Sequence, residues 1–456
     1  MAETKIIVLD DDPTGSQTVH SCLLLTRWDV ETLKIGLRDA APLFFVLTNT
    51  RGMDARSAET LTREVCVNMK QALSELATEG LKINPLLVSR SDSTLRGHYP
   101  VETDVIAEEL GPFDAHFMVP AFFEGGRFTK DSIHYLMVDG EPVPVHKTEF
   151  ARDSVFGYKH SYLPDYVEEK TRGRIKSQNV EQFLLYDVRG DSLARLMALH
   201  DNECCVVDSE NQQDLNHFCE QLMQAASLGK RFLFRSAASL LTALAQLPPQ
   251  PVRANDMAQY VRQGKPGAVI VGSHVQKTTQ QLNVLLTQPG IQAVEVDVER
   301  IDSDPNLLDN IIEKITSLHQ AGLNVVIYTS RTEKTFANQA ERLAFGMRVS
   351  DFLMDVVRHL PKTLGFLISK GGITSNDVLS KGLNLRASRV VGQILPGCSV
   401  VCCPHGHERY PGLPVVIFPG NVGDEQALAK AYGYLALASA SGENTTQPID
   451  SVAEAR

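Results

Sequence analysis

The sequence predicts an α/β protein of two domains, each a mainly parallel sheet flanked by helices, with a ligand cleft between the domains. Short β-rich apolar runs alternate with helical patterns along the 456 residues, which is typical of βαβ units and parallel sheets. A chain of this length exceeds one ordinary hydrophobic core. A segment rich in Pro and Gly divides the alternating pattern into two parts.

The first domain is predicted over residues 1–246. Its apolar runs of strand length lie at 5–9, 43–47, 85–88, 204–207 and 231–234. One face of an amphipathic helix is indicated by apolar residues at three- and four-residue steps, namely Ala58, Leu61, Val65, Met69, Ala72 and Leu76. Residues 120–182 have poor periodicity and many Phe, Tyr and Gly, and we interpret them as an insertion that covers the substrate.

The second domain is predicted over 268–437, after a linker at 247–267. Strand-like runs resume at 268–272, 294–298, 324–328, 364–369 and 415–418, with helical patterns at 305–320 and 333–358. The small and polar residues of 438–456 predict a disordered tail.

Composition narrows the class of function. The net charge of −11 argues against a nucleic-acid partner. No apolar run approaches the roughly 20 residues that span a membrane, and the N-terminus lacks a signal-peptide pattern. The eight Cys are scattered, so we expect reduced thiols and a cytoplasmic protein. A homo-oligomer is compatible with the sequence, which does not determine the oligomeric state.

Two motifs, one acidic and one with an arginine, follow predicted strands in the first half of the chain. VLDDDPTGSQ places Asp11 and Asp12 at the end of the first strand, where open α/β sheets bind ligands. A solvated acidic turn with capping residues is the alternative. VLTNTRG places Arg51 after the next strand, where it can pair with a carboxylate or lie on the surface.

The segment VSRSDSTLRGHYP, residues 88–100, combines hydroxyls, an acid and two guanidinium groups. Its candidate binding residues are Arg90, Ser91, Asp92, Ser93, Thr94 and Arg96. These groups suit a polyhydroxylated anion, because Asp and Ser bind hydroxyls and Arg binds carboxylates. A capped helix start is the alternative interpretation.

Three glycine-containing turns in the second half join a strand to a helix. They are VGSHVQKTTQQL, ISKGGITSNDVL and FPGNVGDEQAL, at 271–282, 368–379 and 418–428. Such turns can hold a phosphate, with Lys370 as a mobile positive charge, or they can be ordinary tight turns. CCPHGHERYPG at 402–412 matches no closed zinc pattern, so we predict no metal site there.

Several of these motifs together resemble the four-carbon acid sugar kinase family. The resemblance rests on DDPTG, the loop Arg51, SDSTLRG, PAF…GR and TEFARD at 148–153. It implies a sugar-binding domain followed by a nucleotide-binding domain. It also implies ATP-dependent phosphorylation of the terminal hydroxyl of threonate, erythronate or an oxo-tetronate. The sequence departs from the family at Ile373, where an acid is usual, and at Phe418-Pro419, where a Lys is usual.

With this resemblance we assign candidate roles. Asp12 is the first candidate for the general base, followed by Asp11 and Asp92. The sugar acid is expected to contact Asp12, Arg51, Arg90, Ser91, Asp92, Ser93, Thr94 and Arg96. ATP is expected to contact Ser273, Gly371, Gly372, Ile373, Thr374, Gly420 and Asn421. Mg²⁺ is expected as the ion that bridges the nucleotide phosphates.

Two other functions are compatible with parts of the sequence. The departures at 373 and 418 suggest a catalytically silent sugar-acid-binding or regulatory protein on the same scaffold. The βαβ pattern suggests an NAD-dependent dehydrogenase, but the first strand is not followed by the Gly-x-Gly-x-x-Gly motif that such enzymes use.

Overall fold

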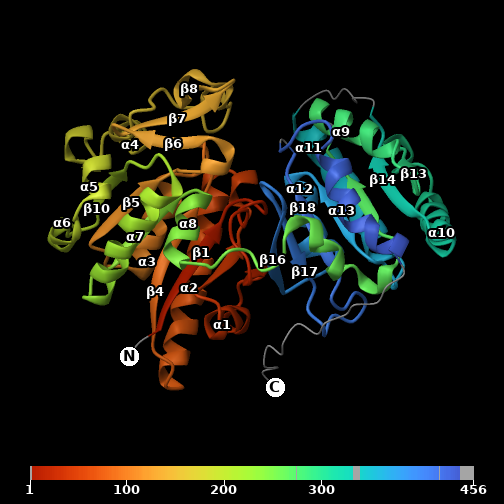
Figure 1. The fold of residues 1–456 in the computed structure, drawn as a ribbon, viewed down its shortest axis with the longest axis horizontal. Coiled ribbons are helices and arrows are strands. Elements are labelled where there is room, and N and C mark those ends of the chain that lie inside the picture. The colour runs from red at the N-terminus through yellow and green to blue at the C-terminus, as the bar shows by residue number, and fades with distance from the viewer. Residues whose placement is uncertain (1–2, 274, 332–338, 421, 442–456) are drawn as a thin grey trace. The chain divides into compact units, whose positions relative to one another are not determined.

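The computed structural model describes residues 3–273, 275–331, 339–420 and 422–441 (Figure 1). The chain forms two compact units. Unit 1 comprises Met1–Gln250 with Leu385–Gly392, and unit 2 comprises Pro251–Asn384 with Gln393–Arg456. The main division therefore falls inside the segment 247–267 that was expected to be a linker. Residues Leu385–Gly392 lie within the expected second domain in sequence but group with unit 1.

Unit 1 contains a parallel sheet in the order β2-β3-β1-β4-β11-β5-β10-β9. Its strands are β1 (Glu3–Asp10), β2 (Cys22–Leu25), β3 (Leu43–Leu47), β4 (Ile83–Arg90), β5 (Ala115–Val119), β9 (Glu181–Phe183), β10 (Glu203–Val207) and β11 (Phe232–Ser236). The runs of Val, Leu, Ile and Phe form strands here because a parallel sheet is buried on both faces. Residues Ala387–Val390 of β16 (Ala387–Leu395) pair antiparallel with β2.

Helices cover this sheet. They are α1 (Val30–Arg38), α2 (Ala55–Thr78), α3 (Val101–Leu110), α4 (Leu163–Lys170), α5 (Leu185–Arg189), α6 (Leu193–Ala198), α7 (Gln212–Ser227) and α8 (Ala238–Ala245). The predicted amphipathic helix is α2, which begins where Asp54 accepts hydrogen bonds from the amides of Arg56 and Ser57, both at 3.0 Å. Val65 and Met69 of α2 pack in one core cluster with Ile7 and Leu9 of β1, so helix and sheet share a core.

The segment 120–182 carries a separate antiparallel sheet of β6 (Arg127–Lys130), β7 (Ile133–Val138) and β8 (Glu141–Pro144). It lies beside the carboxyl edge of the main sheet, because Thr129 bridges to Ser209, just after β10 (Figure 1). Tyr158 and Tyr166 from this segment belong to a second core cluster that also holds Met118 of β5. The segment is therefore packed onto the sheet.

Unit 2 contains parallel strands in the order β13-β14-β12-β15-β18, followed by β17, which pairs antiparallel with β18. The strands are β12 (Ala268–Val271), β13 (Ile291–Val296), β14 (Asn324–Thr329), β15 (Leu367–Lys370), β17 (Cys398–Cys402) and β18 (Pro414–Phe418). The helices are α9 (Gln276–Leu286), α10 (Leu307–Gln320), α11 (Gln339–Arg358), α12 (Gly372–Asp377) and α13 (Ala427–Ser441).

Both ends of unit 2 extend past the predicted domain limits. Residues Ala254–Tyr260 form a 3-10 helix that packs against α13, with Met257 fully buried, so part of the expected linker contributes to this unit. Helix α13 reaches Ser441, inside the expected tail 438–456, and residues 442–456 lie outside the described part of the chain. None of the described helices combines the length and apolar character needed to cross a membrane.

Candidate functional site

Asp10 and Arg90 end neighbouring strands β1 and β4 and lie in register. Arg90 Nη1 is 3.4 Å from Asp10 Oδ1, and both side chains are buried. Burial raises the pKa of Asp10 to about 8, although the charge of Arg90 opposes the shift. A Cβ atom at position 15 would collide with the Asp10 carboxylate, so this turn requires Gly15.

Arg51 binds two of the three consecutive acids. Its guanidinium contacts both oxygens of Asp11, with Nε 3.2 Å from Oδ2, and its Nη1 is 3.1 Å from Asp12 Oδ2. Nη1 is also 4.0 Å from Asp92 Oδ1. Burial alone would lower the pKa of Arg51, but these carboxylates hold it well above its usual value. Arg51 therefore compensates charge from two separate motifs, DDPTG and SDSTLRG.

Asp12 and Asp92 reach the surface, whereas Asp11 does not. Their side chains are 21% and 13% exposed, against 1% for Asp11. Burial would raise the pKa of both exposed carboxyls, but Arg51 together with the other cations and hydrogen-bond donors around them outweighs it, and the pKa of each lies below its usual range. Of the candidate bases, Asp12 and Asp92 are thus ionised groups that a ligand can reach.

The predicted hydroxyl-bearing residues divide into two kinds. Ser91 donates to Asp11 Oδ2, and Thr94 donates through its hydroxyl to Asp92 Oδ2; both are buried. Ser93 is partly exposed. The Ser91 and Thr94 hydroxyls are therefore occupied in orienting carboxylates.

Arg96 connects this loop to the segment 120–182. Its Nε donates to Asp92 Oδ2 at 2.8 Å, and its Nη1 is 3.7 Å from Asp153 Oδ2. The guanidinium also lies over the Phe150 ring, 4.9 Å from the centroid. Arg96 thus contributes both to the acidic cluster and to the packing of TEFARD.

A buried pair beneath the loop was not predicted. Arg235, near the carboxyl end of β11, has Nη1 3.8 Å from Glu102 Oε2 and donates from Nη2 to Arg96 O at 3.3 Å. Glu102 Oε1 accepts from Thr50 at 2.6 Å. The available signal was the Arg-Ser pair that follows the apolar run 231–234, since ligand sites gather at strand ends.

Arg127, the arginine of the PAF…GR motif, was not assigned a role from the sequence. Its Nη1 donates to Gly125 O at 2.6 Å, and its buried Nε has no hydrogen-bond partner among the described residues. Burial lowers the pKa of Arg127, while the negative charge of Asp92 opposes that shift. Arg127 therefore belongs electrostatically to the same cluster.

In unit 2 the three glycine-containing turns follow neighbouring strands. Val271 of β12 pairs with Lys370 of β15, which pairs with Phe418 of β18. Strand order reverses between β12 and β15, because β13 and β14 lie on one side of β12 and β15 on the other. Such a switch point, at the carboxyl ends of parallel strands, is where α/β sheets bind ligands.

The turn after β15 approaches the turn after β12 closely. Gly371 has φ +118°, a conformation that favours glycine, and its amide donates to Phe418 O at 2.8 Å. A Cβ at Gly272 would lie 2.5 Å from Thr374 Oγ1, and a Cβ at Gly371 would lie 3.3 Å from Ser273 Cβ. The predicted residues Ser273, Gly371 and Thr374 are therefore brought together.

Lys370 does not supply a mobile charge, so that interpretation was wrong. The side chain is fully buried, and Nζ donates to Pro419 O at 2.6 Å and Gly420 O at 3.1 Å. Nζ also lies 4.4 Å from the centroid of the Phe418 ring. Burial lowers the pKa of Lys370 to about 7. This lysine fixes the turn after β18 from inside.

The remaining predicted residues of this site differ in their surroundings. Ile373 is 72% exposed, and Gly372 and Gly420 are partly exposed. Asn421 lies outside the described residues. Arg331 was not predicted; its Nη1 donates to Ser273 O at 2.8 Å, which places a guanidinium at the turn after β12.

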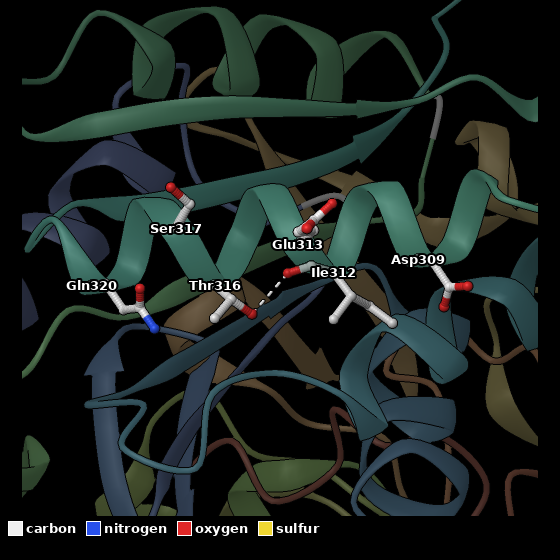
Figure 2. A pocket seen from close by; sticks show the side chains of 6 residues that line it. All are labelled: Asp309, Ile312, Glu313, Thr316, Ser317 and Gln320. Atoms are coloured by element: carbon white, nitrogen blue, oxygen red, sulfur yellow. Dashed lines mark hydrogen bonds between the residues drawn. The ribbon is translucent and has the colours of Figure 1, made fainter.

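Two other features of unit 2 are the cysteines at the end of β17 and a hollow beside α10. Cys402 and Cys403 are buried, and no group of three or more His, Cys, Asp or Glu side chains among the described residues could hold a metal ion. Figure 2 shows a hollow on the side of α10 lined by Asp309, Ile312, Glu313, Thr316, Ser317 and Gln320. It contains none of the strand-end residues, so it is separate from both sites.

Two domain families match the chain in succession. The sugar-binding N-terminal domain matches residues 6–244, and the nucleotide-binding C-terminal domain matches residues 268–428. The chain belongs to the four-carbon acid sugar kinase family. In this family context the charged cluster lies in the sugar-binding domain and the glycine-rich turns lie in the nucleotide-binding domain.

Known members of this kinase family align over nearly the whole chain. D-threonate kinase of Salmonella typhimurium is 24% identical over 94% of this chain and 98% of its own length. D-erythronate kinase of Heliobacterium modesticaldum is 24% identical over 95% and 97%.

Two solved structures have the same fold. They are a Salmonella typhimurium protein described as a putative tRNA synthase, with TM-score 0.65 and 19% identity, and a Haemophilus influenzae protein, with TM-score 0.65 and 17% identity. Each covers 94% of this chain, and the alignments span 98% and 100% of their respective chains. At these identities the likeness shows the fold alone.

Proposed function

We propose that the protein is an ATP-dependent kinase that phosphorylates the terminal hydroxyl of a four-carbon acid sugar, namely threonate, erythronate or 3-oxo-tetronate. The observation that carries this proposal is the pair of surface carboxylates, Asp12 and Asp92, held by Arg51 within the domain related to sugar-binding domains. The full-length likeness to two kinases supports a phosphotransferase.

The first strand-end site is assigned to the sugar acid. Asp12 and Asp92 are ionised and accessible, so they can accept hydrogen bonds from substrate hydroxyls. The Arg96 side chain is 25% exposed, against 19% for Arg51 and 6% for Arg90, and we assign Arg96 to the substrate carboxylate. Arg51, Ser91 and Thr94 then act by holding the carboxylates in place.

Asp12 is the proposed general base. The alcohol O–H bond breaks as its oxygen bonds to the γ-phosphorus, the proton passes to the Asp12 carboxylate, and ADP leaves with the electrons of the broken P–O bond. Because the phosphoryl-transfer transition state is loose, alignment and charge neutralisation matter more than a strong base. A carboxylate with a low pKa is sufficient for this role.

The second strand-end site is assigned to ATP. The turn formed by Gly371 and Gly372 brings the start of α12 next to Ser273; the Gly371 amide already donates to Phe418 O, so the amides from Gly372 onward and the Thr374 hydroxyl are the groups that suit phosphate oxygens. Mg²⁺ would arrive with the nucleotide and neutralise phosphate charge, because the described residues form no acidic cage for it. An ATP-dependent reaction on a metabolite is expected in the cytoplasm.

An assay of ADP release with D-threonate, D-erythronate and 3-oxo-tetronate tests the proposal. We expect turnover of at least one of them with MgATP. Absence of turnover together with absence of ATP binding would overturn the kinase assignment. An Asp12→Asn variant with normal turnover would remove Asp12 as the base.

A silent sugar-acid-binding protein is the second candidate. Ile373 is exposed at the nucleotide turn where the family usually has an acid, and Phe418 stands near the position of a usual Lys. Titration calorimetry separates the two functions. Sugar-acid binding without ATP binding favours the silent protein, and binding of both ligands favours the kinase.

A further inference from the structure

The backbone of the SDSTLRG loop, residues 91–97, is held by the segment 120–182. Three consecutive carbonyls of the loop each accept a hydrogen bond from a ring side chain of that segment. The pairs are His134 Nε2 with Ser93 O at 2.8 Å, Tyr158 OH with Thr94 O at 2.7 Å, and Tyr166 OH with Leu95 O at 2.7 Å. All three rings are buried, so water does not compete for these carbonyls.

The chemistry of the contact assigns the tautomer of His134. A carbonyl oxygen only accepts, so Nε2 carries the proton that is donated to Ser93 O. The neutral ring then accepts at Nδ1 from the Thr129 hydroxyl, 2.9 Å away. Burial lowers the pKa of His134 to about 4, which keeps this neutral arrangement near pH 7.

The loop has a conformation that needs support. Leu95 has φ +67° and Gly97 has φ +116°. A non-glycine residue in this region is strained and persists only where its surroundings enforce the conformation. The carbonyl of Leu95 is the one that Tyr166 holds, and the Leu95 side chain packs in the same cluster as Tyr158 and Tyr166.

The loop is also held from the main sheet. Arg235 of β11 donates to Arg96 O at 3.3 Å, so the next carbonyl along the loop is bound by the main sheet and not by the segment 120–182. With four successive carbonyls engaged, Asp92 and Arg96 project their side chains from a fixed backbone. Their side chains retain 13% and 25% exposure.

We propose that the segment 120–182 is a positioning element for the sugar acid, acting through His134, Tyr158 and Tyr166. These residues set the backbone of the SDSTLRG loop so that Asp92 and Arg96 meet the substrate in one geometry. This inference rests on the proposed function of the loop as the sugar-acid site. It gives the segment a function other than covering the substrate.

Removal of single hydroxyl groups tests the proposal without removing a ring. The variants are Tyr158→Phe, Tyr166→Phe and the double variant. Tyr162→Phe is the matched control, since the Tyr162 hydroxyl donates to Gln182 at 2.9 Å in the same segment and, among the described residues, forms no hydrogen bond with the loop. The measurements are KM for the sugar acid, KM for ATP, and hydrogen exchange of the loop amides in the free protein.

Each single variant is expected to raise KM for the sugar acid about three- to tenfold, the equivalent of one lost hydrogen bond. KM for ATP is expected to stay within twofold, and the loop amides are expected to exchange faster. The double variant is expected to show a larger rise than either single variant. Tyr162→Phe is expected to match the wild type in all three measurements.

Unchanged KM for the sugar acid in the double variant would overturn the positioning role, even if the loop exchanged faster. Equal rises in both KM values would also overturn it, because a general loss of structure would explain them. Failure of the proposed function itself would be distinguishable, because it would be seen in the wild-type protein before any variant is compared with it. In that case the wild-type protein would neither bind nor phosphorylate any of the sugar acids.

Discussion

Strands β1 and β4 of unit 1 end in the charged residues Asp10 and Arg90, whereas β12, β15 and β18 of unit 2 are followed by glycine-containing turns. At the first site Arg51 alone lies within 4.0 Å of three carboxylates. At the second site the close contacts are between backbone and small side chains, such as Gly272 and Thr374. Both sites lie at the carboxyl ends of strands, so the same sheet geometry supports two kinds of recognition.

The difference follows from what each proposed ligand offers. A sugar acid presents hydroxyls in several directions, which are recognised by side chains that must be oriented individually. A phosphate chain presents equivalent oxygens, which backbone amides can bind if no Cβ obstructs them. The site in unit 1 therefore requires a hydrogen-bond network that orients its side chains, whereas the site in unit 2 requires room for phosphate oxygens to approach the backbone amides.

Replacing Arg51 should have the largest effect. Arg51→Ala leaves the buried Asp11 and its neighbour Asp12 without the guanidinium that contacts both, and removes one of the two guanidinium groups beside Asp92. We expect a loss of about 3 kcal/mol or more in the free energy of unfolding of unit 1, and loss of sugar-acid binding. Urea unfolding and calorimetry measure these effects.

The control for that variant is Arg56→Ala, at the exposed start of α2. It should change the unfolding free energy by less than about 0.5 kcal/mol. Equal effects of the two substitutions would contradict a network centred on Arg51.

A glycine substitution tests the second site. Gly371→Ala places a Cβ at φ +118° and 3.2 Å from Thr374 Oγ1. We expect a cost of about 1–3 kcal/mol to unit 2 and at least a tenfold loss of ATP affinity, with sugar-acid affinity unchanged. Gly346→Ala, at an exposed position of helix α11 with no described atom within 4 Å of the added Cβ, should be neutral or stabilising. Loss of sugar-acid affinity in Gly371→Ala would contradict the proposal that the two ligands bind at separate sites.

The two sites should also respond to pH in opposite directions. The pKa of Asp10 is about 8 in the folded protein against about 4 when unfolded, so the native state binds the extra proton and its contribution to stability falls as pH rises from 4 to 8. The pKa of Lys370 is about 7 against about 10.5, so the unfolded state binds the extra proton and stability rises between pH 7 and 10.5.

Unfolding at a series of pH values, with hydrogen exchange to report each unit, checks both signs. Asp10→Asn should flatten the fall in unit 1, and Lys370→Met should flatten the rise in unit 2. An unchanged slope in either variant would show that the buried group titrates normally.

The smallest effect is expected at Ile373. Because this side chain is 72% exposed, Ile373→Asp should change the free energy of unfolding by less than about 0.5 kcal/mol. ATP affinity should change less than threefold, since the proposed phosphate contacts are backbone amides. A tenfold or larger rise in turnover would instead show that the missing acid limits the wild-type protein.

Structural elements that depend on residues close together in the sequence were predicted well. The runs at 5–9 and 43–47 correspond to β1 and β3, because strands buried on both faces need continuous apolar residues. The strand β5 was missed, since its AHFMV run includes a histidine in the sheet. The pairing of β16 with β2 could not be foreseen, because it joins residues more than 350 positions apart with no local signal.

Prediction of the candidate sites was limited in the same way to residues that are close together in the sequence. DDPTG and SDSTLRG each concentrate their chemistry in a few residues, so they were visible in the sequence. Arg235 and His134 are isolated residues that only folding brings to the loop, as it brings Glu102 to Arg235. Lys370 was misjudged because a lysine beside two glycines looks the same whether its side chain faces the ligand or the interior.

By itself, the sequence determined the α/β class, the two-part organisation and the strand ends that carry chemistry, because these follow from periodicity and from residues adjacent in the chain. The tertiary structure decided which carboxylates remain accessible, that Lys370 is internal, and that the segment 120–182 binds the backbone of the SDSTLRG loop. The physical reason is that accessibility and hydrogen-bond partnership depend on neighbours distant in sequence, and burial by those neighbours sets both the pKa and the reach of each group.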